Sequence, residues 1–409
     1  MTWVALKRAV DPKRPITYGI VQAGPHIEGG VPYIRPVDMT DHHGIANPAE
    51  LQRTSPEVAG QYQRSCVKPG DIVVSIGPSY GKTMVVPPDL DGANLTQGTA
   101  RIAPADSWDV RFLRWSLRSN RAMAHWDAAV GGATFRALNL GPLAETPIPL
   151  HPLAEQRAIA DYLDAETARI DALIAKKQQL ITLLEGRRLS VLEARLHHEL
   201  TGHPAVPVRH LASISGGLTL GGATVRGAEV RRPYLRVANV QDGYLDLGDV
   251  AEIDVSPEQA RRFALQDGDV LMLEGNGNPD NLGRGTIWRS EIPGCLHQNH
   301  IHAVRPDRSL LVPEFFNFVV RTPFARSELT GGGGQVSIAT LSKSDIAALR
   351  LPLPPIAKQR AIVDSVRREL SYVDASLRAA AQQIELLAEH RQALITATVT
   401  GQHSVPGNS

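Results

Sequence analysis

The sequence has almost no cysteine and no long apolar run. Cys66 and Cys295 are the only cysteines among 409 residues, which excludes a disulfide framework and suits a reducing compartment. No apolar stretch approaches the roughly 20 residues that a membrane-spanning helix needs. The first residues lack an apolar segment followed by a cleavage site of small residues, so the sequence predicts no secretion signal and a cytoplasmic location.

A surplus of either charge is missing too. Lys and Arg total 43 and Asp and Glu total 42, which gives a formal net charge of +1. Dedicated nucleic-acid binders often carry a clear basic excess, so a nucleic-acid-binding face on this protein must be local and balanced by acidic surface elsewhere. The 43% of hydrophobic and 21% of charged residues are typical of folded soluble proteins. The length indicates two domains with connecting elements.

What the sequence does contain is one pattern written twice. PYIRPV at residues 32–37 recurs as PYLRVA at residues 233–238, an offset of 201 residues. KPGDIV at residues 68–73 recurs as QDGDVL at residues 266–271, an offset of 198 residues. The segments keep their order, so the chain is interpreted as two copies of one unit.

Each copy begins with a stretch rich in glycine, proline and short apolar runs, which predicts a mixed α/β globular domain of short strands and turns. A hinge flanked by proline follows, and then a long helical pattern. We therefore predict an α+β protein with two globular α/β domains in tandem and two long helices that form an antiparallel coiled coil, related by an internal pseudo-two-fold repeat. The predicted boundaries are residues 1–151 for the first globular domain, 152–202 for the first helix, 203–354 for the second globular domain, 355–402 for the second helix and 403–409 for a tail.

Both long helices carry a heptad pattern. In the first helix, one heptad position holds Leu163, Ile170, Leu184 and Val191 and the other holds Ile159, Leu173 and Leu180; in the second, the first position holds Val366, Val373, Ala380, Leu387 and Leu394. This spacing predicts a coiled-coil seam. Gly202 and Gly401 are predicted to cap the helix ends in the left-handed conformation.

The seam is interrupted at matching places in the two helices. Glu166 and Glu369 occupy equivalent positions, and so do Arg187 and His390. Buried polar groups at such places fix the register of a coiled coil at some cost in stability. At ~1.5 Å per residue, a helix of about 46 residues spans about 70 Å, or about two turns of B-DNA at ~34 Å each. Such helices would hold two globular domains at a fixed distance.

Two segments resemble nucleotide-binding and zinc-binding motifs but do not match them. GPSYGKT at residues 77–83 has three residues between its glycines, where a nucleotide-binding P-loop has four. Cys295, His297, His300 and His302 lack a second ligand pair with zinc spacing, and strand alternation would place His297 and His300 on opposite faces. The sequence contains no Asn/Asp-Pro-Pro-Tyr/Phe segment, the signature of adenine methyltransferases, and no nuclease-like cluster of carboxylates. No metal site and no catalytic residue are predicted.

The most specific feature opens each long helix. It reads PLAEQRAI at residues 152–159 and PIAKQRAI at residues 355–362. Two globular domains, each followed by a long helix with this opening, closely resemble the specificity subunits of Type I restriction–modification enzymes. The resemblance covers nearly the whole chain. LGRG at residues 282–285 and CLHQNH at residues 295–300 are also similar to the family, whereas the first domain matches these two segments only loosely.

The resemblance implies a DNA-binding protein without an active site of its own. Each globular domain would be a target-recognition domain for one half of a split, asymmetric target in double-stranded DNA. The helices would set the spacer and bind two methyltransferase (modification) subunits, and restriction/translocase subunits would join that core. No cofactor is expected in this chain; S-adenosylmethionine, ATP and Mg²⁺ are expected in the partner subunits. The pseudo-two-fold repeat suits a two-fold arrangement of partners.

Candidate DNA contacts are side chains on the loops and strand ends of the two domains, because Arg and Lys suit guanine edges and phosphates and Gln and Asn suit adenine. They are Tyr33, Arg35, Lys82, Gln97 and Arg101 in the first domain, and Tyr234, Arg236, Arg284, Gln298, Asn299 and His300 in the second. A structural role remains the alternative, since repeated residues can hold the shared fold while the residues that differ carry specificity.

At the hinges, Gln156, Arg157, Gln359 and Arg360 are candidate contacts for a partner subunit. The alternative, which the sequence leaves open, is that they cap the helices and pack the hinge. A run of glycines at residues 331–334 predicts a flexible loop that orders against DNA.

Three other functions remain as alternatives. A coiled-coil scaffold whose domains bind protein would have no affinity for DNA. An enzyme that uses ATP would need the near-miss P-loop to bind nucleotide. A specificity subunit of a related Type II system would pair with a fused methyltransferase–nuclease, which neighbouring genes would reveal. The target sequence cannot be predicted, because DNA shape adds specificity at bases that no side chain contacts.

Overall fold

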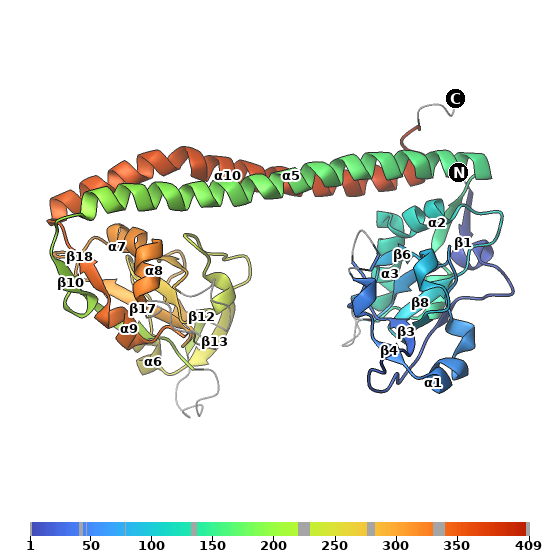
Figure 1. Ribbon diagram of the computed structural model, residues 1–409, viewed down its shortest axis with the longest axis horizontal. Coiled ribbons are helices and arrows are strands. Elements are labelled where there is room, and N and C mark those ends of the chain that lie inside the picture. Colours follow the sequence, from blue (N-terminus) through green and yellow to red (C-terminus); the bar gives the residue numbers. More distant parts are fainter. Residues whose placement is uncertain are drawn as a thin grey trace. The chain divides into compact units, whose positions relative to one another are not determined.

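The computed structural model describes residues 2–40, 44–45, 47–77, 79–131, 137–219, 230–275, 283–329 and 340–405. The chain divides into two compact units, each assembled from separate parts of the sequence. Unit 1 comprises Met1–Gln178 with Ala381–Ser409, and unit 2 comprises Gln179–Ala380. Figure 1 shows that each unit contains a globular body and a stretch of both long helices, α5 (Leu153–Leu200) and α10 (Ile356–Val399).

Unit 1 contains a four-stranded sheet of order β2-β8-β5-β6, a three-stranded sheet of order β4-β3-β7 and the pair β1-β9. Its strands are β1 (Thr2–Ala5), β2 (Thr17–Tyr18), β3 (Val31–Ile34), β4 (Arg53–Thr54), β5 (Ile72–Ser75), β6 (Thr83–Val85), β7 (Asn94–Leu95), β8 (Thr99–Ile102) and β9 (Pro147–Leu150). Its shorter helices are α1 (Pro56–Gln61), α2 (Val110–Leu117), α3 (Asn120–Val130) and α4 (Leu140–Ala144).

Unit 2 repeats this arrangement with sheets of order β11-β17-β14-β15 and β13-β12-β16 and the pair β10-β18. Its strands are β10 (Ala205–Pro207), β11 (Ala212–Gly216), β12 (Val230–Leu235), β13 (Ala251–Val255), β14 (Val270–Leu273), β15 (Gly285–Ile287), β16 (Leu296–His297), β17 (Ile301–Pro306) and β18 (Arg350–Pro352). Its shorter helices are α6 (Pro257–Arg262), α7 (Pro313–Val320), α8 (Pro323–Leu329) and α9 (Lys343–Ala348).

The centre of each unit is the strand that the repeated apolar run predicted. All four residues of β5 and all four of β14 are buried. The aspartate before each strand accepts a two-point ion pair, from Arg14 to Asp71 and from Arg305 to Asp269. Buried carboxylates of this kind need such partners. The two copies therefore keep the aspartate but take its arginine from different parts of the fold.

Within each unit, the halves of α5 and α10 run antiparallel, which confirms the predicted coiled coil. In unit 1, Arg391 Nε lies 3.0 Å from Asp171 Oδ1. In unit 2, Arg188 Nε lies 3.1 Å from Asp374 Oδ1. Each residue of one pair is 203 residues from its counterpart in the other, so the contact between the helices is part of the repeat.

The predicted seam is correct in its first position and wrong in part of its second. Leu163 and Ile170 are buried, but Leu173 and Leu180 are exposed. Two helices alone cover only one narrow face of each other, so residues beside the seam face solvent. The polar interruption at Arg187 and His390 is wrong as well, because both side chains are exposed.

The predicted caps at the ends of the long helices are confirmed. Gly202 and Gly401 have positive φ values of 83° and 69°, as left-handed caps require. Among the described residues, no helix is long and apolar enough to cross a membrane.

Candidate nucleic-acid interface

Three loops of unit 1 meet beside the ends of the central strands, and they carry three of the predicted DNA contacts. Lys82 Nζ donates to the carbonyl of Met39 at 2.8 Å. The backbone amide of Gly77 donates to Gly98 O at 3.1 Å. The loops that hold Arg35, Lys82 and Gln97 are thereby joined, and Gln97 is exposed on its loop.

Arg35 is held in a fixed orientation. Its Nη2 and Nε atoms donate to the two carboxylate oxygens of Asp38 at 2.7 and 3.0 Å. The hydrogen bond to Asp38 raises the pKa of the Arg35 guanidinium above its ordinary value. The side chain remains about a third exposed, so it stays accessible to a phosphate or a guanine edge.

The equivalent loops of unit 2 also meet. Arg236 Nη2 donates to Asp249 Oδ2 at 2.7 Å. At the position of Asp38 the repeat has Asn239, whose side-chain oxygen accepts from the Arg236 backbone amide at 2.8 Å. The side-chain oxygen of Gln298 accepts from the amide of Val237 at 3.2 Å. One backbone contact is common to both units, since Thr96 N–H donates to Ile34 O at 3.2 Å in unit 1 and Gln298 N–H donates to Leu235 O at 2.9 Å in unit 2.

Two further predicted contacts of unit 2 lie on the same side. Arg284 Nη1 lies 3.4 Å from Gln241 Oε1, and His300 Nδ1 lies 2.7 Å from Glu274 Oε2. The described residues thus bring together Arg236, Arg284, Gln298, Asn299 and His300. All five are at least partly exposed.

The loop that carries Gln241 is anchored to the body of unit 2 through Asp242. Arg321, of which only 1% is exposed, donates to both oxygens of Asp242 at 2.9 and 3.0 Å. Burial opposes ionisation of Asp242, but the charges of Arg321, Arg326 and Arg188 outweigh it, so the pKa of Asp242 is lowered. Since Arg188 also binds Asp374 on α10, the loop is tied to the coiled coil.

Three of the predicted contacts are structural residues. Arg101 is 4% exposed, and its guanidinium donates to the carbonyls of Arg64, Cys66 and Pro15 at 2.7, 3.0 and 3.2 Å. Tyr33 and Tyr234 are also buried, and the Tyr234 hydroxyl donates to Leu218 O. Because these three side chains are buried inside the globular bodies, they are not accessible for direct contact with DNA.

The hinge glutamines turn inward. Gln156 and Gln359 are buried. Gln156 accepts from the amide of Asp109 at 2.8 Å and donates to His151 O at 2.8 Å. Gln359 accepts from the amide of Val312 at 2.9 Å and donates to Pro354 O at 2.9 Å. Each glutamine thus clamps the globular body of its unit to one long helix, which favours the hinge-packing alternative.

Arg157 and Arg360 are exposed next to these clamps. They remain the predicted contacts for a partner subunit.

The near-miss motifs hold structural positions. The P-loop-like segment joins the antiparallel strands β5 and β6 rather than a strand and a helix, and Lys82 is bound to a carbonyl.

The cysteine and histidine segment of unit 2 is buried. Burial raises the pKa of the Cys295 thiol to about 12 and lowers the pKa of the His297 imidazole to about 4. Among the described residues, no three His, Cys, Asp or Glu side chains are placed to share a metal ion. The glycines at residues 331–334 and Leu282 lie outside the described residues.

The sequence-based prediction missed the anchoring residues Asp242 and Arg321 and the pairs between the long helices. The helix pairs carried a detectable signal, because Arg188 and Asp171 each recur 203 residues later as Arg391 and Asp374. The pairing of Asp242 with Arg321 has no counterpart signal in the sequence.

Known proteins share parts of this sequence and this arrangement of two loop sets and paired helices. Residues 25–183 match the family model of the Type I restriction modification DNA specificity domain. A chain solved in work on complex assembly and conformational transition of the type I R-M system has the same fold over 97% of both chains, with a TM-score of 0.58 and 19% sequence identity. The likeness to specificity subunits that the hinge segments indicated is confirmed.

The curated relatives agree with this class. The chain is 29% identical over 241 residues to the Type I restriction enzyme EcoKI specificity subunit of Escherichia coli (strain K12), a match that covers 56% of this chain and 51% of the relative. It is 24% identical over 371 residues to the EcoBI specificity subunit of Escherichia coli, which covers 84% of this chain and 74% of the relative. The chain thus spans about half the length of the first of these relatives.

Proposed function

We propose that this chain is the DNA-reading specificity subunit of a Type I restriction–modification complex. Each unit reads one half of a split, asymmetric target in double-stranded DNA with its set of joined loops. The chain performs no chemistry itself and directs partner methyltransferase and restriction subunits to the target. S-adenosylmethionine, ATP and Mg²⁺ act in those partners.

The observation that carries the proposal is the duplication of the candidate surface. In both units an arginine that follows the repeated Pro-Tyr segment is paired with an aspartate, at 2.7 Å for Arg35 and at 2.7 Å for Arg236. In both units the loop after β7 or β16 lies against the loop of that arginine. Two surfaces of one design whose exposed side chains differ are suited to a target with two different halves.

The near-neutral net charge fits this arrangement. Phosphate contacts give affinity that depends on salt, and base contacts give specificity. With a formal net charge of +1, this chain alone supplies little nonspecific attraction to DNA. Most of the affinity is therefore expected in the complex with the methyltransferase subunits.

The experiment that tests the proposal maps methylated adenine across the genome in cells with the gene, without it, and with it restored. One split motif should lose its methylation on deletion and regain it on restoration. Unchanged methylation, in cells where the partner methyltransferase is shown to be expressed and to co-purify with this chain, would refute the proposal. Co-purification with a fused methyltransferase–nuclease would instead assign the chain to the related Type II arrangement.

A further inference from the structure

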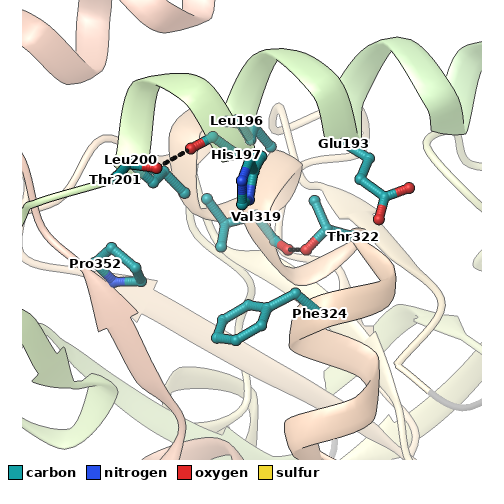
Figure 2. A pocket seen from close by; sticks show the side chains of 9 residues that line it. All are labelled: Glu193, Leu196, His197, Leu200, Thr201, Val319, Thr322, Phe324 and Pro352. Carbon is teal, nitrogen blue, oxygen red and sulfur yellow. Dashed lines mark hydrogen bonds between the residues drawn. The ribbon is translucent and has the colours of Figure 1, made fainter.

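Unit 2 contains an apolar pocket beside the end of α5, with a volume of about 220 Å³. The pocket is lined by Glu193, Leu196, His197, Leu200, Thr201, Val319, Thr322, Phe324 and Pro352. In Figure 2 the imidazole of His197 and the ring of Phe324 face each other across the hollow, with Pro352 at its end. Phe324 is 55% exposed, so its ring is accessible to a partner at the wall of the pocket.

The repeat shows what occupies the same position in unit 1. In unit 1, Trp3 of β1 pairs with Pro149 of β9. In unit 2, Ala205 of β10 pairs with Pro352 of β18, a pocket residue. Pro352 lies 203 residues after Pro149, so Ala205 stands where unit 1 has tryptophan.

The wall of the pocket differs in a matching way. In unit 1 the Arg121 guanidinium lies 4.1 Å from the centre of the Trp3 ring and covers it. The residue 203 positions later is Phe324. Unit 1 thus has an indole under a cation at this place, whereas unit 2 has a phenyl ring with no tryptophan beneath it.

We propose that this pocket binds one aromatic ring of indole size, presented as a side chain by a partner polypeptide. The ring takes the place that Trp3 fills in unit 1, against Phe324 and Pro352. Stacked aromatic pairs are favourable beyond the area that they bury. Tryptophan in an apolar pocket is also a common anchor of protein interfaces.

The rim of the pocket supports a tryptophan on a protein partner. Glu193 is exposed at the rim, and its carboxylate can accept the hydrogen bond that an indole N–H must make when it is buried. In unit 1 the ring belongs to Trp3 of strand β1. By analogy, we expect the ring bound in unit 2 to be a side chain of a polypeptide. The identity of the partner as a methyltransferase or restriction subunit rests on the proposed function; the ring-binding site does not.

The first test uses the full chain and 5-fluoroindole, followed by ¹⁹F NMR of the ligand. We expect saturable binding with a dissociation constant on the order of 1 mM, as suits a small ring in a preformed apolar site. The variant Ala205→Trp should fill the pocket from within. It should abolish binding of 5-fluoroindole and raise the melting temperature by a few degrees.

The control is Tyr372→Ala, which removes an aromatic ring that is 79% exposed and lies outside the pocket lining. This variant should bind 5-fluoroindole as the wild type does, whereas Phe324→Ala should weaken binding at least fivefold. Absence of binding to the wild type, or undiminished binding to folded Ala205→Trp, would overturn the site.

A second test shows whether the ring comes from the subunits of the proposed complex. The Ala205→Trp variant should assemble at least tenfold more weakly with the methyltransferase or restriction subunits, while Tyr244→Ala, which removes a ring that is 62% exposed outside the pocket lining and outside the long helices, assembles normally. If assembly is unchanged although 5-fluoroindole binds, the ring does not come from those partners and the protein-partner claim falls. Neither readout involves DNA, so failure of the pocket and failure of the DNA-reading function give different results.

Discussion

Arg391 and Asp171 join the two long helices across unit 1, and the same contact recurs in unit 2 between Arg188 and Asp374. Arg391 is 6% exposed and Asp171 25%, so the pair is shielded from solvent on one side. A shielded ion pair stabilises little against an apolar alternative, but the loss of one partner leaves a buried charge. The pair therefore selects the register in which both aspartates meet both arginines.

The substitution Asp171→Asn should lower the free energy of unfolding by roughly 3 kcal/mol, because Arg391 loses its counter-charge. Urea unfolding followed by circular dichroism measures the change. The control is Glu145→Gln, which breaks the exposed pair with Lys7 and should cost less than about 1 kcal/mol. The exchange Asp171→Arg with Arg391→Asp should recover at least half of the loss; equal effects of Asp171→Asn and Glu145→Gln would show that the helix pair is unimportant.

Arg284→Ala should weaken binding of the assembled complex to its target DNA by about 10- to 100-fold, as expected for the loss of a contact to a base edge. Fluorescence anisotropy at one fixed salt concentration, on the motif found by methylation mapping, measures the loss. Arg308→Ala is the matched control, because Arg308 binds Asp267 ahead of β14, at the end opposite to Glu274. If both variants lose affinity equally, Arg284 does not contact a base.

Gln156→Ala should lower the free energy of unfolding by about 1–3 kcal/mol, because the buried amide of Asp109 and the carbonyl of His151 lose their partner. Arg157→Ala should leave stability within about 0.5 kcal/mol of the wild type, as for other surface substitutions, and weaken assembly with the methyltransferase. Denaturant unfolding and analytical gel filtration separate the two effects. A stable Gln156→Ala variant that fails to assemble would restore Gln156 as a contact residue.

Asp242→Asn should destabilise the protein at pH 7, and its deficit should shrink in acid. The pKa of Asp242 in the folded state lies below its ordinary value of 3.8, because of the nearby charges of Arg321, Arg326 and Arg188. Its contribution to stability is therefore complete well above pH 3.8 and is lost as the pH falls through the folded-state pKa. Urea unfolding of both proteins at pH 7, 5 and 3.5 measures the difference, with Asp246→Asn, an exposed carboxylate of the same loop, as control. A deficit that does not change with pH would remove the charge of Asp242 from the explanation.

The sequence was informative where side chains obey a repeat. The duplicated segments predicted two bodies of the same kind, and the repeated apolar run became the central strand of each body, β5 in unit 1 and β14 in unit 2. Leu163 and Ile170 lie in the seam as their spacing requires. These features depend on periodicity, which a single sequence displays.

Arg101 shows where this reasoning ends. A charged residue in a short strand suggests an exposed face, but all four residues of β8 are buried, including Arg101. A strand covered on both faces does not alternate between apolar and polar side chains. The carbonyls that accept from Arg101 come from residues 15, 64 and 66, and only the fold brings these segments together.

The glutamine clamps have a consequence for how such a protein changes over time. Gln156 holds the globular body of unit 1 by the backbone amide of Asp109, and Gln359 holds that of unit 2 by the amide of Val312. Aspartate and valine share no side-chain chemistry, so the attachment is indifferent to which amino acid supplies the amide. Any residue except proline, which lacks an N–H, can therefore stand at these two positions of the globular bodies and keep the attachment to the helix.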